Sequence, residues 1–115
     1  MNGFLLDTTV LIDWLRGHAP TVAWLEQAAM SGQRLVLSPI TVAEVFTGTP
    51  PEHRPTRRNQ LLAYEYEPLS FDVAQTAGEL RREYQHRGRP IPLPDLLQAA
   101  LARKLGLVLA TSNPV

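Results

Sequence analysis

The sequence predicts a three-layer α/β fold with a central parallel sheet, and two observations carry this prediction. Short apolar runs alternate with longer segments of helical periodicity along the 115 residues, which is typical of strands joined by crossover helices. The apolar runs, such as Leu35–Leu37, contain no polar residue, as expected for buried strands. At this length we expect a single domain, residues 1–115, with room for one substantial core.

The first half of the chain predicts two strands and three helices. In chain order these are a strand at Gly3–Leu6, helices at Val10–Leu15 and Thr21–Met30, a strand at Leu35–Leu37 and a helix from Ser38 to Phe46. Gly17 ends the first helix and Gly32 the second, since glycine favours helix termini. Pro39 is well placed in the first turn of the third helix. The run from Gly48 to Pro51 is a break.

The second half continues the alternation. In chain order it predicts a helix at Pro55–Tyr66, a short strand at Glu67–Ser70, a helix at Phe71–His86, a helix at Asp95–Leu105 and a strand at Leu107–Ala110. Asp72 is expected to begin the longest helix and Gly88 to end it. Three prolines between Arg89 and Pro94 predict an extended, non-helical segment.

The composition excludes several classes of protein. The absence of cysteine excludes a disulfide scaffold and thiolate metal sites, and it suits a reducing compartment. The first residues, Met1–Phe4, lack a basic leader. No apolar run has the length that spans a bilayer. We therefore expect a soluble cytoplasmic domain with no membrane contact.

Three acids and one amide stand where predicted strands end or predicted helices begin. They are Asp7, Glu44, Asp95 and Asn113. Ligands of parallel sheets bind beyond the carboxyl ends of the strands, so these side chains are expected to face one crevice. Gathering carboxylates is costly because like charges repel, and a cation offsets that cost. A donor set made only of oxygen suits Mg²⁺ or Mn²⁺ better than zinc.

Each acid also has a structural interpretation. Asp7 fits an Asx turn or a helix cap, and Asp95 fits a simple N-cap. Thr41 and Glu44 have the spacing of a capping box, in which the glutamate bonds back to the cap residue. Taken singly, each acid is explained by capping, but their recurrence in successive α/β units favours a shared cation site.

The formal net charge of +0 gives no general attraction for nucleic acid. The basic residues are nevertheless nearly all arginine, whose planar side chain suits phosphates and bases. Arg54, Arg57 and Arg58 lie three and four positions apart, so one helical face would present them together to RNA. The alternative is a solvated helix face, and the sequence leaves both open.

Four segments of the chain carry a family resemblance. They are Phe4–Ile12, Ser38–Gly48, Ile91–Ala102 and Leu107–Asn113. In this order they resemble the PIN domain family, specifically the VapC-type toxin ribonucleases, over essentially the whole chain. The resemblance implies a PIN-like sandwich and an endoribonuclease that depends on Mg²⁺ or Mn²⁺ and cuts RNA. It further implies a homodimer silenced by a cognate VapB-like antitoxin.

The resemblance also assigns roles to individual residues. Asp7, Glu44 and Asp95 match the acidic metal-binding positions of the family, while Thr8 and Thr111 match hydroxyls that orient those carboxylates or a bound water. Asn113 stands where many relatives carry aspartate, so it offers an oxygen without a negative charge. Relatives usually continue for another strand beyond the point at which this sequence stops, so the final strand of that fold is not evident here.

Three other functions compete with this interpretation. A haloacid-dehalogenase-like phosphatase would need a second aspartate two residues after Asp7, where this chain has Thr9. A response-regulator receiver would need a lysine after a late strand, whereas Lys104 falls inside a predicted helix. The stronger alternative is a PIN-like module that binds RNA or a partner and has little or no catalytic activity.

Overall fold

Four parallel strands form a single sheet within residues 2–112, the part of the chain that the computed structural model describes. The strands are β1 (Gly3–Leu6), β2 (Arg34–Leu37), β3 (Glu65–Tyr66) and β4 (Val108–Ala110), in the spatial order β3-β2-β1-β4. Leu5 of β1 pairs with Val36 on one side and with Leu109 on the other. Because all four strands run the same way, their carboxyl ends meet along one edge.

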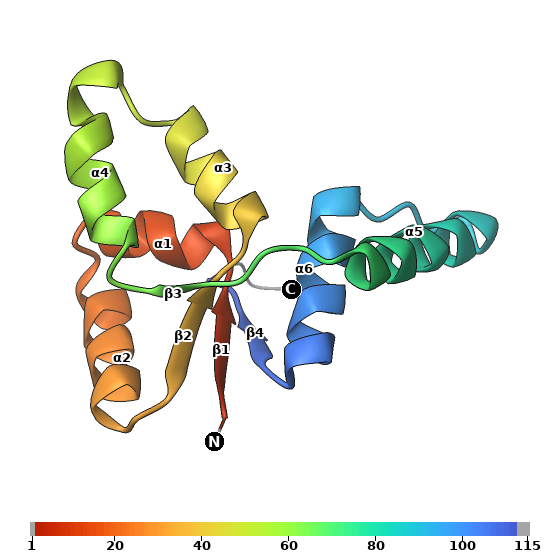
Figure 1. Cartoon of the computed structure of the whole chain (residues 1–115), viewed down its shortest axis with the longest axis horizontal. Helices are drawn as coiled ribbons and strands as arrows, with labels where there is room; N and C mark the ends of the chain where they lie inside the picture. Colours follow the sequence, from red (N-terminus) through yellow and green to blue (C-terminus); the bar gives the residue numbers. More distant parts are fainter. Residues whose placement is uncertain (1, 113–115) are drawn as a thin grey trace.

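Helices cover both faces of the sheet (Figure 1). One face carries α1 (Thr8–Leu15), α2 (Ala19–Met30), α3 (Pro39–Thr47) and α4 (Arg54–Leu61), with a 3₁₀ turn at Pro51–His53 before α4. The other face carries α5 (Phe71–His86) and α6 (Leu93–Leu105). This arrangement confirms the predicted three-layer α/β/α architecture with a central parallel sheet.

The sheet separates two hydrophobic cores, and alternate residues of β1 and β2 supply them. Leu5 and Val36 pack with α5 and α6, whereas Leu6 and Leu37 pack with α1 to α4. Successive side chains of a strand point to opposite faces, so a strand with helices on both sides must be apolar at every position. This explains the apolar runs Phe4–Leu6 and Leu35–Leu37 in the two central strands.

The central strands approach each other closely where β1 begins. Gly3 pairs with Arg34, and a Cβ at position 3 would lie only 2.4 Å from the backbone oxygen of Arg34. The Arg34 side chain in turn forms an ion pair of 2.8 Å with Glu65 of β3. This contact lowers the pKa of the Glu65 carboxyl and raises the pKa of the guanidinium. Gly3 therefore allows β1 to lie close to β2, and the Arg34–Glu65 ion pair links β2 to β3.

Two predicted boundaries between α4 and α5 were wrong. The helix predicted at Pro55–Tyr66 ends at Leu61, and the strand predicted at Glu67–Ser70 lies at Glu65–Tyr66. Tertiary contacts override helical propensity here. The ring of Tyr64 packs edge-on against Trp14 with centroids 5.2 Å apart, and its burial raises the pKa of the phenol to about 12. The next two residues, Glu65 and Tyr66, form β3 and pair with β2.

The starts of α5 and α6 also differ from expectation. Ser70, not Asp72, caps α5, and its hydroxyl oxygen accepts a hydrogen bond from the Val73 amide at 3.2 Å. Helix α6 begins at Leu93, so Pro94 lies in its first turn and Asp95 is not its N-cap. Proline is tolerated in a first turn because its missing N–H would have no helical partner there.

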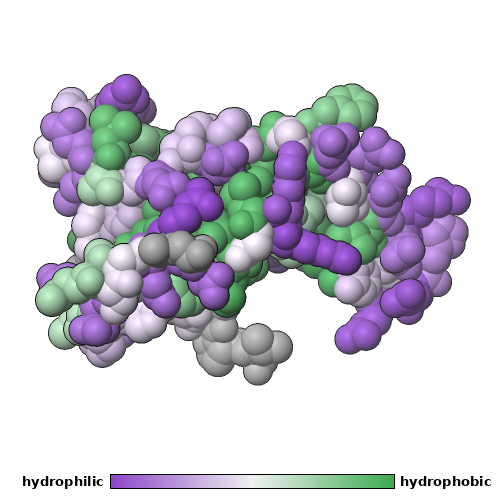
Figure 2. Space-filling view, turned by 60° about the horizontal axis from the view of Figure 1, so that its bottom comes forward, coloured by the Kyte–Doolittle hydropathy of each residue, from purple (hydrophilic) through white to green (hydrophobic). Residues whose placement is uncertain are grey.

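The surface is divided between apolar and charged areas. Met30, Phe71 and Val108 are large apolar side chains that remain exposed. Figure 2 shows apolar surface in the middle of one face and a hydrophilic end where α5 projects from the body. Within residues 2–112, each helix is either too short or too polar to cross a membrane.

Candidate active site

Asp7 lies at the carboxyl edge of the sheet, between the end of β1 and the start of α1. Its carboxylate accepts hydrogen bonds from the hydroxyls of Thr9 and Thr111, at 3.1 and 3.0 Å. Its backbone amide donates to the carbonyl of Ala110 at 2.9 Å, which ties the end of β1 to the end of β4. Asp7 holds the N-cap position of α1, but its side chain bonds no helix amide. The carboxylate is therefore held by hydroxyls rather than used as a cap.

Glu44 lies on α3, and its carboxylate accepts a 2.6 Å hydrogen bond from the Thr8 hydroxyl. The capping-box interpretation of Thr41 and Glu44 was wrong. Ser38 caps α3, with its side-chain oxygen accepting from the Thr41 amide, and Thr41 is buried in the first turn. Since Thr8 follows Asp7 directly, the Thr8 bond connects Glu44 to the residue next to the first acid.

Asp95 lies in the first turn of α6, across the edge of the sheet from α3 (Figure 1). Its side chain is exposed. The buried Gln98 follows one turn later on the same side of the helix. All three acids are thus at the carboxyl side of the sheet, although they come from three different elements.

The predicted metal ligands do not form one cluster in this structure. Among residues 2–112, no three histidine, aspartate or glutamate side chains are grouped closely enough to hold a metal ion. Asp7 and Glu44 each turn toward threonine hydroxyls, and like charges resist closer approach. Asn113 lies outside the described residues.

The hydroxyl groups around Asp7 form a larger set than the sequence indicated. Thr8 and Thr111 contact the carboxylates as described above. Thr9 was missed, although its hydroxyl donates to Asp7 and accepts from the Ser112 amide at 3.1 Å. The sequence signal for Thr9 was the pair of consecutive threonines after Asp7. Both threonines lie in the first turn of α1, so both hydroxyls are near the acid.

The three arginines expected to act together are separated. Arg57 and Arg16 line a cavity of about 220 Å³ that also contains Glu44. Arg58 instead lines a different hollow with Phe46 and other apolar side chains of α3 and α4, and Arg54 is exposed. Arg16 was missed because it follows the last helical residue of α1, far in sequence from the other basic residues. Of the predicted set, Arg57 alone lines the cavity that contains Glu44, and its guanidinium donates to Gln60 at 2.9 Å.

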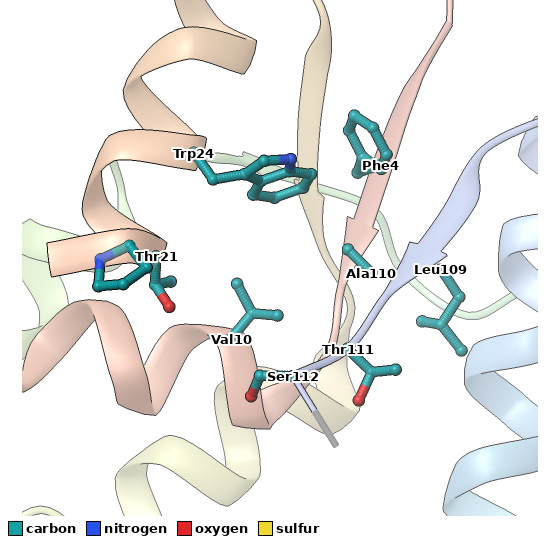
Figure 3. Close-up of a pocket in the computed structure, with 9 residues that line it drawn as sticks. Phe4, Val10, Thr21, Trp24, Leu109, Ala110, Thr111 and Ser112 are labelled. Carbon is teal, nitrogen blue, oxygen red and sulfur yellow. The ribbon is translucent and has the colours of Figure 1, made fainter. Parts of the chain in front are cut away.

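A second cavity lies between α2 and the end of β4 (Figure 3). It measures about 400 Å³ and is mostly apolar, with Phe4, Val10 and Trp24 among its lining residues. Phe4 and Trp24 meet edge to face with ring centroids 4.8 Å apart, and 39% of Trp24 remains exposed. Thr111 lines this cavity and also donates to Asp7, so the cavity opens next to the acid.

Comparison with known proteins agrees with this geometry. Residues 4–114 match the PIN domain family. The chain is 34% identical over 109 residues to Ribonuclease VapC10 of Mycobacterium tuberculosis, covering 95% of this chain and 81% of the relative. It is 26% identical over 118 aligned positions to the tRNA(fMet)-specific endonuclease VapC of Shigella flexneri, covering 98% and 88%.

A solved structure extends the likeness to three dimensions. The crystal structure of VapBC2 from Rickettsia felis, bound to a DNA fragment from its promoter, contains a similar chain with a TM-score of 0.82 and 26% identity. The similarity covers 98% of this chain and 88% of that one. Sequence and structure agree over nearly the full length, and the chain belongs to the PIN domain family, with VapC ribonucleases among its relatives.

Proposed function

We propose that this chain is a metal-dependent endoribonuclease and the toxin of a VapBC-type toxin–antitoxin pair. The observation that carries the proposal is the position of Asp7 and Glu44 at the carboxyl edge of the sheet, where Thr8, the residue after Asp7, bonds to Glu44. Each carboxylate is oriented by a threonine hydroxyl, in a chain 34% identical to a ribonuclease. Sheets of this type bind their ligands at this edge.

The donor atoms fit a hard divalent cation. Asp7, Glu44 and Asp95 offer carboxylate oxygens, and the chain has no cysteine. This donor set favours Mg²⁺ or Mn²⁺, which are held by few carboxylates, water and substrate phosphate. When bound, such an ion makes hydroxide available near neutral pH and offsets charge on the phosphate. Asn113 is proposed to add an amide oxygen without a further charge.

The chain's own residues orient the reacting groups. Thr8 holds Glu44, while Thr9 and Thr111 hold Asp7, so neither carboxylate rotates freely. Arg57, which shares a cavity with Glu44, would bind an RNA phosphate next to the acids. Because the site is an open edge rather than a deep slot, it suits a single-stranded or looped segment of RNA.

Cleavage assays with and without metal test the proposed function. We expect the purified chain to cut total RNA in the presence of Mg²⁺ or Mn²⁺ and to stop when EDTA is added. The sites of cleavage are then mapped by sequencing the new RNA ends. Binding of RNA without cleavage under all metal conditions would instead identify a non-catalytic PIN-like module.

We also propose a VapB-like antitoxin and a second copy of the chain as partners, in the reducing cytoplasm. The structure supports this with an apolar hollow between α3 and α4, where Leu62 and Tyr66 are 63% and 56% exposed. Such a hollow fits an amphipathic helix. An antitoxin arginine inserted between the acids would block the site electrostatically. Full cleavage in the presence of equimolar antitoxin would contradict the proposed inhibition. A chain that sediments strictly as a monomer would contradict the proposed homodimer.

The Thr8→Val variant should impair catalysis through Glu44. The substitution preserves side-chain volume and removes the 2.6 Å hydrogen bond to Glu44. Loss of such an orienting bond reduces activity by about 10- to 100-fold in comparable metal sites. The rate of RNA cleavage at saturating Mg²⁺ measures the effect, with Thr76→Val on the exposed surface of α5 as a matched control. Equal rates for both variants would show that Thr8 does not position Glu44.

Arg57 and Arg58 offer a paired test of the RNA path. Arg57→Ala should weaken RNA binding and reduce the slope of log affinity against log salt by about 0.7, the value for one phosphate contact on a single strand. Arg58→Ala should leave the slope unchanged, because Arg58 lines a hollow that does not contain Glu44. Binding is measured in EDTA to prevent cleavage. Equal slopes in both variants would mean that RNA does not pass Arg57.

A further inference from the structure

Gln98 is a buried amide that connects three elements of the fold. It lies on α6 and is only 2% exposed. Its Oε1 accepts a hydrogen bond from the Ser38 hydroxyl at 2.6 Å, and its Nε2 donates to the Thr41 hydroxyl oxygen at 2.8 Å. Thr41 donates in turn to the backbone carbonyl of Leu6 at 3.0 Å. A single chain of hydrogen bonds thus runs from α6 through α3 to β1.

The direction of these bonds is fixed. The Ser38 oxygen accepts from the Thr41 amide and its hydroxyl donates to Gln98, while the Thr41 hydroxyl is committed to Leu6. Gln98 must therefore present its NH₂ group to Thr41 and its oxygen to Ser38. Within the described part of the chain, every buried side-chain nitrogen and oxygen has a hydrogen-bond partner. Such a fully satisfied network specifies one arrangement.

Three members of this polar layer are close in sequence to the three acids. Leu6 immediately precedes Asp7. Glu44 follows Thr41 by three positions on α3, and Asp95 precedes Gln98 by three positions on α6, so each pair shares one side of its helix. Leu6, Thr41 and Gln98 are therefore each one residue or one turn from an acid.

The layer also joins helices from opposite faces of the sheet. Helix α3 packs on α1 and α4, whereas α6 packs on α5 and β4, on the opposite face of the sheet. The Gln98 side chain spans the gap between these layers at the carboxyl edge. Apolar packing would fill that gap without the cost of burying an amide, but it would not impose a fixed direction.

We infer that Gln98 is a positioning residue that, through Ser38 and Thr41, sets the orientation of the start of α6, which carries Asp95, relative to α3 and β1, which lead to Glu44 and Asp7. The inference rests on the proposed function, because it assigns these acids to one metal site. Without the Gln98 bonds, α6 would still pack on α5, but its N-terminal half would lose the hydrogen bonds that orient it against Ser38 and Thr41.

The test compares two variants of the full chain. Gln98→Leu has similar volume and removes both side-chain bonds, while the double variant Gln98→Leu, Thr41→Val also removes the bond from Thr41 to the Leu6 carbonyl. The double variant leaves one more buried polar group without its partner, so it should be the less stable of the two. Ser70→Ala is the control, since it removes the cap of α5 and a hydrogen bond from Lys104, which lies at the opposite end of α6 from Asp95. Mn²⁺ affinity by electron paramagnetic resonance, cleavage rate and thermal unfolding are measured for each.

We expect both Gln98 variants to bind Mn²⁺ about 10-fold more weakly and to cleave RNA about 10- to 100-fold more slowly. The double variant should lose more stability than Gln98→Leu but no more Mn²⁺ affinity, and Ser70→Ala should lose stability alone. A Mn²⁺ affinity that falls in step with stability across the three variants would overturn the inference and leave a purely structural layer, as would unchanged affinity in an active Gln98→Leu chain. An unmodified chain that binds no Mn²⁺ and cuts no RNA would overturn the proposed function as well, so the two failures are distinguishable.

Discussion

The Asp7→Asn variant is expected to cleave RNA about a thousandfold or more slowly than the unmodified chain, since it would remove a charged ligand of the proposed metal ion. The fold should be retained. Asparagine keeps an oxygen that can accept the hydrogen bonds from Thr9 and Thr111, and the lost charge relieves repulsion from the neighbouring acids. Initial rates of cleavage at saturating Mg²⁺ give the size of the effect, and thermal unfolding reports the fold.

A matched aspartate outside the site separates this effect from a general loss of charge. Asp72→Asn changes an exposed acid in the first turn of α5 and should leave cleavage unchanged. An active Asp7→Asn variant would show that Asp7 serves only to hold Thr9 and Thr111. Unfolding of that variant would likewise assign the carboxylate a structural role.

The Leu5→Ala variant should lose about 3 kcal/mol of unfolding free energy, within the range of about 2 to 5 kcal/mol for a buried leucine. Leu5 is 0% exposed and lies in β1, which has a strand on each side. Its side chain packs into the core under α5 and α6, so truncation leaves a cavity that two helices and a sheet cannot easily close. The midpoint of urea denaturation measures the loss.

Met30→Ala provides the comparison for this prediction. Met30 ends α2 and is 83% exposed, so its truncation should change the unfolding free energy by no more than about 0.5 kcal/mol. If Leu5→Ala were no less stable than Met30→Ala, the core formed by β1 with α5 and α6 would be loosely packed or absent in solution.

The sequence predicts the order and type of the main elements because each is encoded locally. The strand at Gly3–Leu6 and the helix at Phe71–His86 have the predicted bounds. The boundary after α4 depends instead on Tyr64 reaching Trp14 and on Glu65 reaching Arg34, which are contacts far apart in sequence. Local periodicity contains no information about such partners.

The same distinction applies to the candidate site. The acids stand out because charge beside an apolar run is visible in the sequence. Gln98 does not, because it lies in an alanine- and leucine-rich helix and its partners Thr41 and Ser38 are 57 and 60 positions away. The sequence also does not predict that Arg57 and Arg58 have different surroundings. Their spacing fits one helical face, and only the packing of α4 places them in different cavities.

The pairing of β1 with β4 has a consequence for the order of folding. The hydrogen bond from Thr111 to Asp7 joins residues 104 positions apart, whereas β1 meets β2 after about a third of that separation. Closing the longer loop costs more chain entropy, and such distant contacts form slowly. A folding intermediate in which β1 has paired only with β2 would contain Asp7, Thr8 and Glu44 but would lack the Thr111 contact. We therefore expect this site to assemble late in folding, so that a partly folded chain would lack the complete set of contacts around Asp7.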